Sequence, residues 1–149
     1  MMISKMYESV VKAGRTAGFL LGMTMLFVSA AVSGAEFRFA DNGKAECVIV
    51  LPDRPKGFEQ DAAKDLQHFL SRMTGADFKV MPESKVPAEG SAIYVGQTEY
   101  AGKQDIHFDK LTPEEWVIRP VGKNLILSGG HPIGSFYAVW NLLNQFGCY

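Results

Sequence analysis

The sequence predicts an α+β domain of two layers, with two helices on one face of a mixed, mostly antiparallel sheet of about six strands. The expected order is two strands, a helix, two strands, a loop, two strands and a closing helix. Two amphipathic helices against one sheet form a two-layer arrangement. A strand, a helix and a second strand in succession favour at least one parallel pair, which makes the sheet mixed.

The first 35 residues have the pattern of a secretory signal peptide. The basic residues Lys5, Lys12 and Arg15 precede a nearly uncharged apolar run over residues 17–32, and the small residues 33–35 follow it. The alternative is an uncleaved membrane anchor, but the run contains glycine and hydroxyl residues and is shorter than the ~20 residues of a membrane span. We therefore expect cleavage after Ala35, a secreted or periplasmic location, and no stable membrane anchor after cleavage.

Residues 36–149 then form one domain with a modest core. The chain has 15 Lys+Arg and 16 Asp+Glu, and the first 35 residues hold three of the basic and one of the acidic residues, so the domain is net acidic. Because it shows no basic stripe with interleaved aromatic residues, nucleic acid is not an expected partner. Cys47 and Cys148 permit a disulfide in an exported chain, although the apolar run around Cys47 favours a small buried residue.

The first half of the domain contains the most regular pattern. Residues 36–40 alternate as a short strand, residues 45–51 form an apolar strand that Pro52 ends, and residues 41–43 form the turn between them. The segment 58–74 is an amphipathic helix. Its apolar positions are Ala62, Leu66, Phe69, Leu70 and Met73, and Gly75 occupies the place of a left-handed C-cap.

The second half contains four shorter predicted strands. They cover residues 77–81, 91–95, 114–119 and 125–128, and the last two form a hairpin. Residues 82–90 are a polar loop, and residues 97–109 form a loop with one helical turn.

The closing helix, residues 134–146, is apolar over an arc of roughly 200°, whereas a helix on a single sheet needs only about 100°. We therefore expect this helix to be covered by its own domain and by a second domain, and the chain to be a fragment. The residues predicted to face the second domain are Phe136, Trp140, Leu143 and Phe146, with membership of the domain's own core as the alternative.

No catalytic constellation is visible in the sequence, and no cofactor or metal is expected. Glu114 and Glu115 are adjacent, and neighbouring side chains on a strand point to opposite faces, so they cannot form a glycosidase pair. The run 129–135 has phosphate-loop spacing, but Ser135 occupies the place of the essential lysine, and a tight strand-to-helix turn explains the glycines. The histidines lack metal-binding spacing.

Four blocks, taken in order, carry a family resemblance. They are AAKDLQHFLSRMTGADFKV, AIYVGQT, EEWVIRPVGKNLILSGG, and a G-x-x-Y-A-x-x-x-L-L-x-x-x-G-C run that begins at Gly134. This set resembles the N-terminal domain that precedes the catalytic barrel in bacterial α-glucuronidases, in family 20 β-N-acetylhexosaminidases and in related barrel hydrolases. One departure is Ile133, where such proteins often have arginine.

The resemblance implies a small domain packed against a TIM barrel that carries the catalytic carboxylates, so no catalytic residue is assigned to this chain. The expected function is that of a non-catalytic accessory domain of an exported polysaccharide-degrading hydrolase, with its own downstream catalytic barrel as partner. The alternative is a free-standing carbohydrate-binding module. Candidate contacts to a polysaccharide or oligosaccharide are His131, Trp116 and Tyr137.

Overall fold

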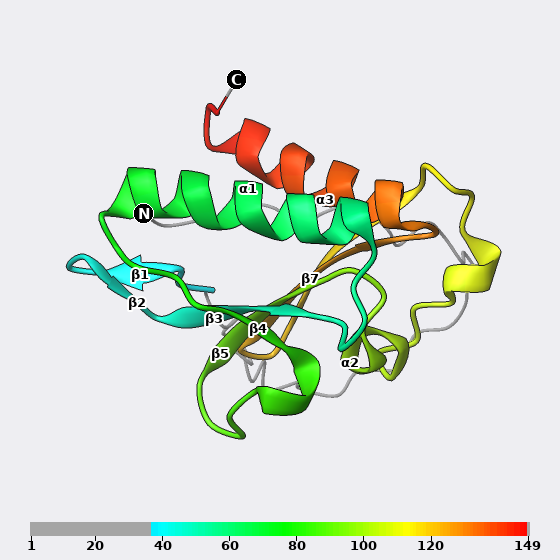
Figure 1. Ribbon diagram of the computed structural model, residues 1–149, viewed down its shortest axis with the longest axis horizontal. Helices are drawn as coiled ribbons and strands as arrows, with labels where there is room; N and C mark the ends of the chain where they lie inside the picture. The colour runs from blue at the N-terminus through cyan, green and yellow to red at the C-terminus, as the bar shows by residue number, and fades with distance from the viewer. Residues whose placement is uncertain (1–36, 149) are drawn as a thin grey trace, which may run out of the picture.

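A five-stranded sheet in the order β4–β3–β5–β7–β6 forms the centre of the fold (Figure 1). The computed structural model describes residues 37–148, so the predicted signal peptide and its cleavage site lie outside the described residues. The strands are β3 (Cys47–Leu51), β4 (Val80–Pro82), β5 (Ser91–Val95), β6 (Trp116–Val121) and β7 (Asn124–Gly129). A separate two-stranded sheet joins β1 (Ala40–Asp41) and β2 (Lys44–Ala45).

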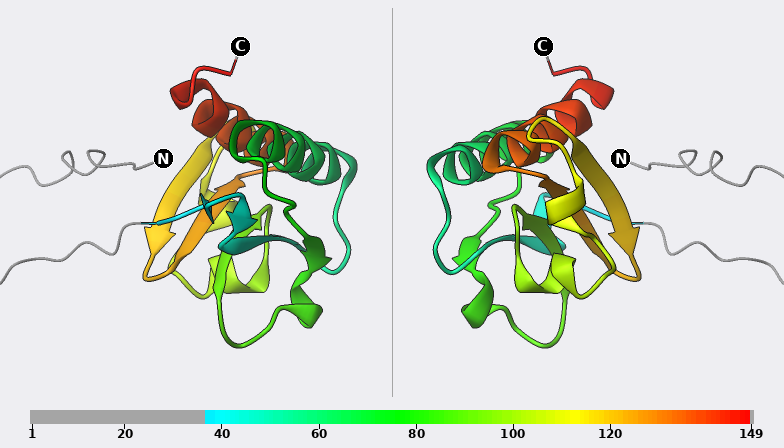
Figure 2. Two further views of the ribbon diagram at one scale, coloured as in Figure 1. Left: turned by 90° about the vertical axis from the view of Figure 1, so that its left-hand side faces the viewer. Right: turned by 90° about the vertical axis from the view of Figure 1, so that its right-hand side faces the viewer.

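Two long helices, α1 (Gly57–Thr74) and α3 (Pro132–Gln145), lie side by side on one face of the sheet (Figures 1 and 2). They run in the same direction, because Phe58 and Phe136 meet near their starts and Met73 and Cys148 meet near their ends. The predicted two-layer α+β arrangement, with both helices on one face, is confirmed.

The five-stranded sheet is mixed, as predicted, but it has more parallel strand pairs than expected. In the five-stranded sheet β3 pairs in parallel with β4 and with β5, β5 pairs in parallel with β7, and the β6–β7 hairpin is antiparallel. The β3–β4 pair is parallel because α1 crosses over the sheet between the two strands. Strands β5 and β7 are parallel because β6 lies between them in the chain and runs antiparallel to β7. The antiparallel pairs of the described residues are the two hairpins, β1–β2 and β6–β7.

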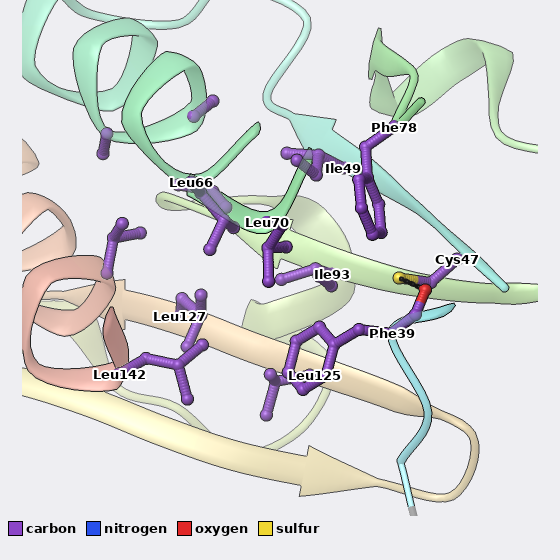
Figure 3. Close-up of a cluster of buried hydrophobic side chains, with 14 of the residues drawn as sticks. Phe39, Cys47, Ile49, Leu66, Leu70, Phe78, Ile93, Leu125, Leu127 and Leu142 are labelled. Atoms are coloured by element: carbon purple, nitrogen blue, oxygen red, sulfur yellow. Dashed lines mark hydrogen bonds between the residues drawn. The ribbon is translucent and has the colours of Figure 1, made fainter. Parts of the chain in front are cut away.

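The main core lies between the sheet and the two helices. Ile49 and Ile93 point up from the central strands, Leu66 and Leu70 point down from α1, and Phe78 closes one side (Figure 3). Phe39 enters the same core from the segment before β1, and its ring packs edge-on against Phe146 at 5.5 Å between ring centroids.

The opposite face of the sheet is also covered. Val50, Tyr94 and Ile126 point away from α1 and α3 and pack with Ala101 of the short helix α2 (Glu99–Gly102) and with Ile106. The strands β3, β5 and β7 are therefore buried on both faces, which explains their continuous apolar sequences.

Several predicted boundaries agree with the structure. Strand β5 coincides with the prediction, α1 starts one residue earlier, and Gly75 is the left-handed C-cap with φ of 70°. Of the predicted strand at 36–40, Ala40 is the residue that belongs to a strand, as the start of β1, while Phe39 accepts a backbone hydrogen bond from the Glu46 N–H at 2.9 Å and residue 36 lies outside the described residues. The 3-10 helices at Glu83–Lys85 and Phe108–Lys110 were not predicted.

Cys47 and Cys148 are both free, so the structure does not pair them. Cys47 is buried in the main core, and its thiol donates a hydrogen bond to the carbonyl oxygen of Phe39 at 3.6 Å (Figure 3). Burial, with a smaller contribution from the nearby Glu46 carboxylate, raises the pKa of Cys47 from 9.0 to about 12.

We expect Cys47 to make the folded domain less stable as the pH rises from about 9 towards 12. In this range the thiol ionises in the unfolded chain but stays protonated in the folded chain, so the free energy of unfolding falls. Urea unfolding between pH 7 and pH 10.5 should show a steeper fall for the wild type than for Cys47→Ala. Equal slopes would show that Cys47 ionises alike in both states.

Candidate functional site

The parallel strands place the ends of β3, β4, β5 and β7 at one edge of the sheet, which is where open sheets of this kind bind ligands. The loops that follow these strands bring Glu59, Glu83, Gln97 and the turn 129–134 to this carboxyl edge. This carboxyl edge is therefore the candidate site of the domain.

Glu59, in the first turn of α1, is the buried acid of this edge, with 3% of its surface exposed. Its carboxylate accepts the backbone N–H of Lys56 at 2.8 Å and the backbone N–H of Gln97 at 3.0 Å. The first bond closes the N-terminal turn of α1, and the second joins α1 to the end of β5. Both oxygen atoms of Glu59 are thus occupied by the backbone of its own domain.

Gln97 continues this network towards α3. Its side-chain amide donates to the carbonyl oxygens of Gly129 at 3.2 Å and of Gly130 at 2.7 Å. The hydroxyl of Ser128, which is fully buried, donates to the carbonyl oxygen of Gly96 at 2.8 Å. The end of β5 is therefore tied both to the start of α1 and to the turn that leads into α3.

The other acids of the edge also bind backbone amides. The Glu83 carboxylate accepts the N–H groups of Glu99 and Tyr100 at 2.8 and 2.7 Å, which satisfies the start of α2. The Asp53 carboxylate accepts the N–H of Ser84 at 2.9 Å, and this bond lowers the pKa of Asp53. Glu115 binds the N–H of Thr112 in the same way.

The glycines of the turn 129–134 are required by close packing. The segment 111–115 crosses directly over them, and the N–H of Gly130 donates to the carbonyl oxygen of Glu115 at 3.0 Å. A Cβ atom at Gly129, Gly130 or Gly134 would overlap backbone oxygen atoms of this segment. The sequence-based interpretation of these glycines as a tight turn rather than a phosphate loop is therefore consistent with their surroundings.

The three candidate ligand contacts are all exposed. His131 is the N-cap residue of α3, and its side chain makes no capping hydrogen bond. Trp116 is paired in the sheet with Gly129, which precedes His131 by two residues. Trp116 and His131 therefore lie at the same end of the β6–β7 hairpin. Tyr137 is on the exposed face of α3, where its ring contacts Phe136. The contact of these residues with a sugar stays a prediction.

The four predicted interface residues differ in how far they are buried within the domain. Leu143 is fully buried in the domain's own core and is not accessible to a second domain, which corrects its assignment. Phe146 is partly buried against Phe39. Phe136 and Trp140 remain partly exposed beside α1. They belong to an aromatic seam that we define by the residues Phe58, Phe69, Phe136, Tyr137 and Trp140.

The aromatic seam follows the line where α1 and α3 meet. Phe58 contacts Phe136 at 6.2 Å between ring centroids, and Phe69 contacts Trp140 at 5.6 Å. The indole N–H of Trp140 donates to the Asp65 carboxylate at 3.1 Å, which fixes the orientation of the ring. Sequence reasoning missed Phe58, which is 50% exposed, because it precedes the regular apolar positions of α1.

The ring orientations do not form a flat platform for a sugar. Ring pairs within the seam are inclined by 49° to 71° to one another. Tyr94 and Tyr100 are stacked at 4.1 Å with an angle of 13°, but Tyr94 is buried, so this pair packs on itself. Sugar binding by a row of coplanar exposed rings therefore has no support among the ring pairs of residues 37–148.

A cavity of about 460 Å³ lies at the opposite edge of the sheet, beside the start of β3 and β5. Side chains of both charges line it: Lys44, Lys79 and Lys123, and Glu46, Asp77 and Glu89. All six of these residues are exposed. The acids of this cavity are therefore in contact with solvent rather than buried.

Comparison with protein-family models and with curated proteins finds no match to this chain. Within residues 37–148, no group of three or more His, Cys, Asp or Glu residues is arranged to hold a metal ion. In the same part of the chain, no helix has both the length and the apolar character needed to cross a bilayer.

We expect Glu59→Gln to destabilise the domain by about 1–3 kcal/mol. The amide nitrogen of glutamine would face a backbone N–H in a buried place, which leaves a donor without an acceptor. Glu99→Gln is the matched control. Glu99 forms only an exposed ion pair with Lys103, so its change should cost less than about 0.5 kcal/mol. Equal midpoints of urea unfolding for the two variants would contradict the role of Glu59.

We also expect Gly130→Ala to destabilise the domain by about 1–3 kcal/mol, because the new methyl group forces the segment 111–115 to move. Gly57→Ala is the control, since a Cβ atom there meets open space and helix formation improves. Thermal unfolding should therefore show a lower Tm for Gly130→Ala and an unchanged or higher Tm for Gly57→Ala. A similar Tm for both variants would show that the turn can relax.

Proposed function

We propose that this chain is the non-catalytic N-terminal domain of an exported glycoside hydrolase of the α-glucuronidase type. In this proposal a signal peptide ends at Ala35, and a catalytic barrel that degrades a polysaccharide follows the domain. The order of four sequence blocks, from residue 62 to Cys148, supports the proposal by its resemblance to the domains that precede such barrels. The α+β fold is compatible with it.

The non-catalytic role is supported by the hydrogen bonds that the acidic residues of the carboxyl edge make within the domain. Retaining and inverting glycosidases need two carboxyl groups that face the substrate, one of them able to give a proton. Here Glu59, Glu83 and Glu115 accept hydrogen bonds from backbone N–H groups of their own domain. Acids held in this way fix the loops of their own domain.

A free-standing carbohydrate-binding module is the second candidate. It would be favoured by exposed rings that share a plane, because sugar faces stack on flat aromatic surfaces. The inclined rings of the aromatic seam favour packing against another protein surface instead. Trp116, which is 43% exposed and lies outside the aromatic seam, favours a sugar-binding role.

We expect a protein limited to residues 36–149 to show no hydrolysis of glucuronoxylan or of aryl glycosides, since its edge acids are engaged by the backbone. The complete encoded protein should hydrolyse one of these substrate classes under the same conditions. Release of reducing sugar measures the hydrolysis of glucuronoxylan by each protein, and release of the chromogenic aryl group measures the hydrolysis of aryl glycosides. Turnover by residues 36–149 that a single Asp or Glu substitution abolishes would overturn the proposal.

A further inference from the structure

The cavity of about 460 Å³ lies at the amino edge of the sheet, where β3, β5 and β7 begin. It is on the sheet face opposite α1 and α3, because Val48, Ala92 and Tyr94 of its lining pack in the cluster on that face. The segment 86–90 before β5 also lines it, with the apolar residues Val86 and Pro87. A cavity of this volume is within the range of small-molecule sites.

Tyr94 is the buried polar residue of this lining. Its side chain belongs to a residue that is 7% exposed, and its ring stacks on Tyr100 at 4.1 Å between ring centroids. The hydroxyl of Tyr94 forms no hydrogen bond within residues 37–148, and it is in contact with solvent rather than sealed in the core. Because a buried tyrosine hydroxyl usually has a hydrogen-bond partner, this one is available to a ligand in the cavity.

Asn124 adds a second neutral polar group whose position is fixed. Its Oδ1 atom accepts the backbone N–H of Ala92 at 3.0 Å, and its Nδ2 atom donates to the hydroxyl of Tyr100 at 2.9 Å. A side-chain amide has two N–H donors, and the second one of Asn124 forms no hydrogen bond within residues 37–148. The cavity therefore offers an uncharged hydroxyl and an uncharged N–H, both held in place by the sheet.

The charged side chains of the lining are balanced and interspersed. They are Lys44, Glu46, Asp77, Lys79, Glu89 and Lys123. In the segments that lead into β3 and into β4, a lysine and an acid are two residues apart, so the two signs are not separated into two regions. None of these six side chains forms an ion pair within residues 37–148.

This distribution of charge favours an uncharged ligand that has many hydroxyl groups. A ligand with a net charge finds equal numbers of attractive and repulsive groups, and a zwitterion needs two regions of opposite charge. A hydroxyl group both donates and accepts, so it can bind a carboxylate or an ammonium group wherever either one lies. Hydrogen bonds to charged groups are also stronger than bonds between neutral groups.

We propose that the amino-edge cavity binds a small uncharged saccharide of one or two sugar units. The sugar hydroxyls bind the lysine and carboxylate side chains of the lining, and one of them binds the hydroxyl of Tyr94. The C–H groups of the sugar pack on Val48 and Val86, which are partly buried beside the cavity.

This site is separate from the three exposed candidate contacts. Lys123 is in the turn of the β6–β7 hairpin, whereas Trp116 and His131 lie at the other end of that hairpin. Tyr137 is on α3, which covers the other face of the sheet. The proposal does not rest on the proposed function, because the groups that line the cavity carry it alone.

The test measures hydrogen exchange by mass spectrometry in the complete encoded protein, with and without added ligand. Peptides that cover residues 86–95 and 121–126 report binding at the cavity, even if sugars also bind elsewhere. The probes are glucose, xylose, cellobiose and xylobiose, with glycine as a zwitterion and acetate as an anion. We expect at least one of the sugars to slow exchange in both peptides, and added salt to leave its affinity unchanged, because ions screen charged ligands.

Tyr94→Phe removes the free hydroxyl and keeps the ring. We expect this variant to need about tenfold more sugar for the same protection, because one hydrogen bond to the ligand is lost. Its Tm should equal that of the wild type, since the hydroxyl has no partner within the domain. Tyr137→Phe is the matched control, because it removes the hydroxyl of an exposed tyrosine on α3 and should leave the affinity unchanged.

Four results would overturn the proposal. These are no protection of the two peptides by any of the sugars, protection by glycine or acetate instead, and equal affinity of Tyr94→Phe and the wild type. The fourth is a loss of affinity in Tyr137→Phe alone, which would place the sugar on the exposed rings. Hydrolysis, which tests the proposed function, is measured separately, so either proposal can fail while the other stands.

Discussion

The fold depends on how a buried carboxylate is satisfied. Glu59 has almost no exposed surface, and its two oxygens accept backbone N–H groups that lie before α1 and after β5. A buried carboxylate that lost these donors would be costly, so the start of α1 is held at one position above the sheet. Gly96, with φ of 98°, has no room for a side chain because the Glu59 carboxylate fills that space.

This constraint extends across the domain through Gln97 and the glycine turn. The backbone N–H of Gln97 donates to Glu59 on one side, and its side-chain amide donates to the carbonyl oxygens of Gly129 and Gly130 on the other. The edge that holds ligands in many parallel sheets is thereby filled with hydrogen bonds within the domain. The free apolar surface lies instead on the helix layer, at the seam between α1 and α3.

The elements with strong local signals were predictable from the sequence. Helix α1, strand β5 and the β6–β7 hairpin follow from periodicity, from Gly75 and from the turn at Gly122. The number of parallel pairs in the five-stranded sheet could not be predicted, because paired residues such as Ile93 and Leu125 are 32 positions apart and leave no local trace in the sequence.

The candidate site was harder to predict for a related reason. An acidic residue in the first turn of a helix is favoured by the helix dipole, and the bond of Glu59 to Lys56 is a local contact of this kind. Its second bond, to Gln97, joins residues that are 38 positions apart and exists only in the folded chain. The burial of Leu143 likewise depends on where α3 sits between β7 and α1, which the width of its apolar arc does not specify.

The contact between Phe39 and Phe146 has a consequence for how the domain can be combined with others. It brings a residue near the beginning of the described chain against a residue near its end. A module whose entry and exit points adjoin can be spliced into a host polypeptide at a single surface position without pulling the flanking parts of the host apart. Its geometry thus suits genetic shuffling between larger architectures.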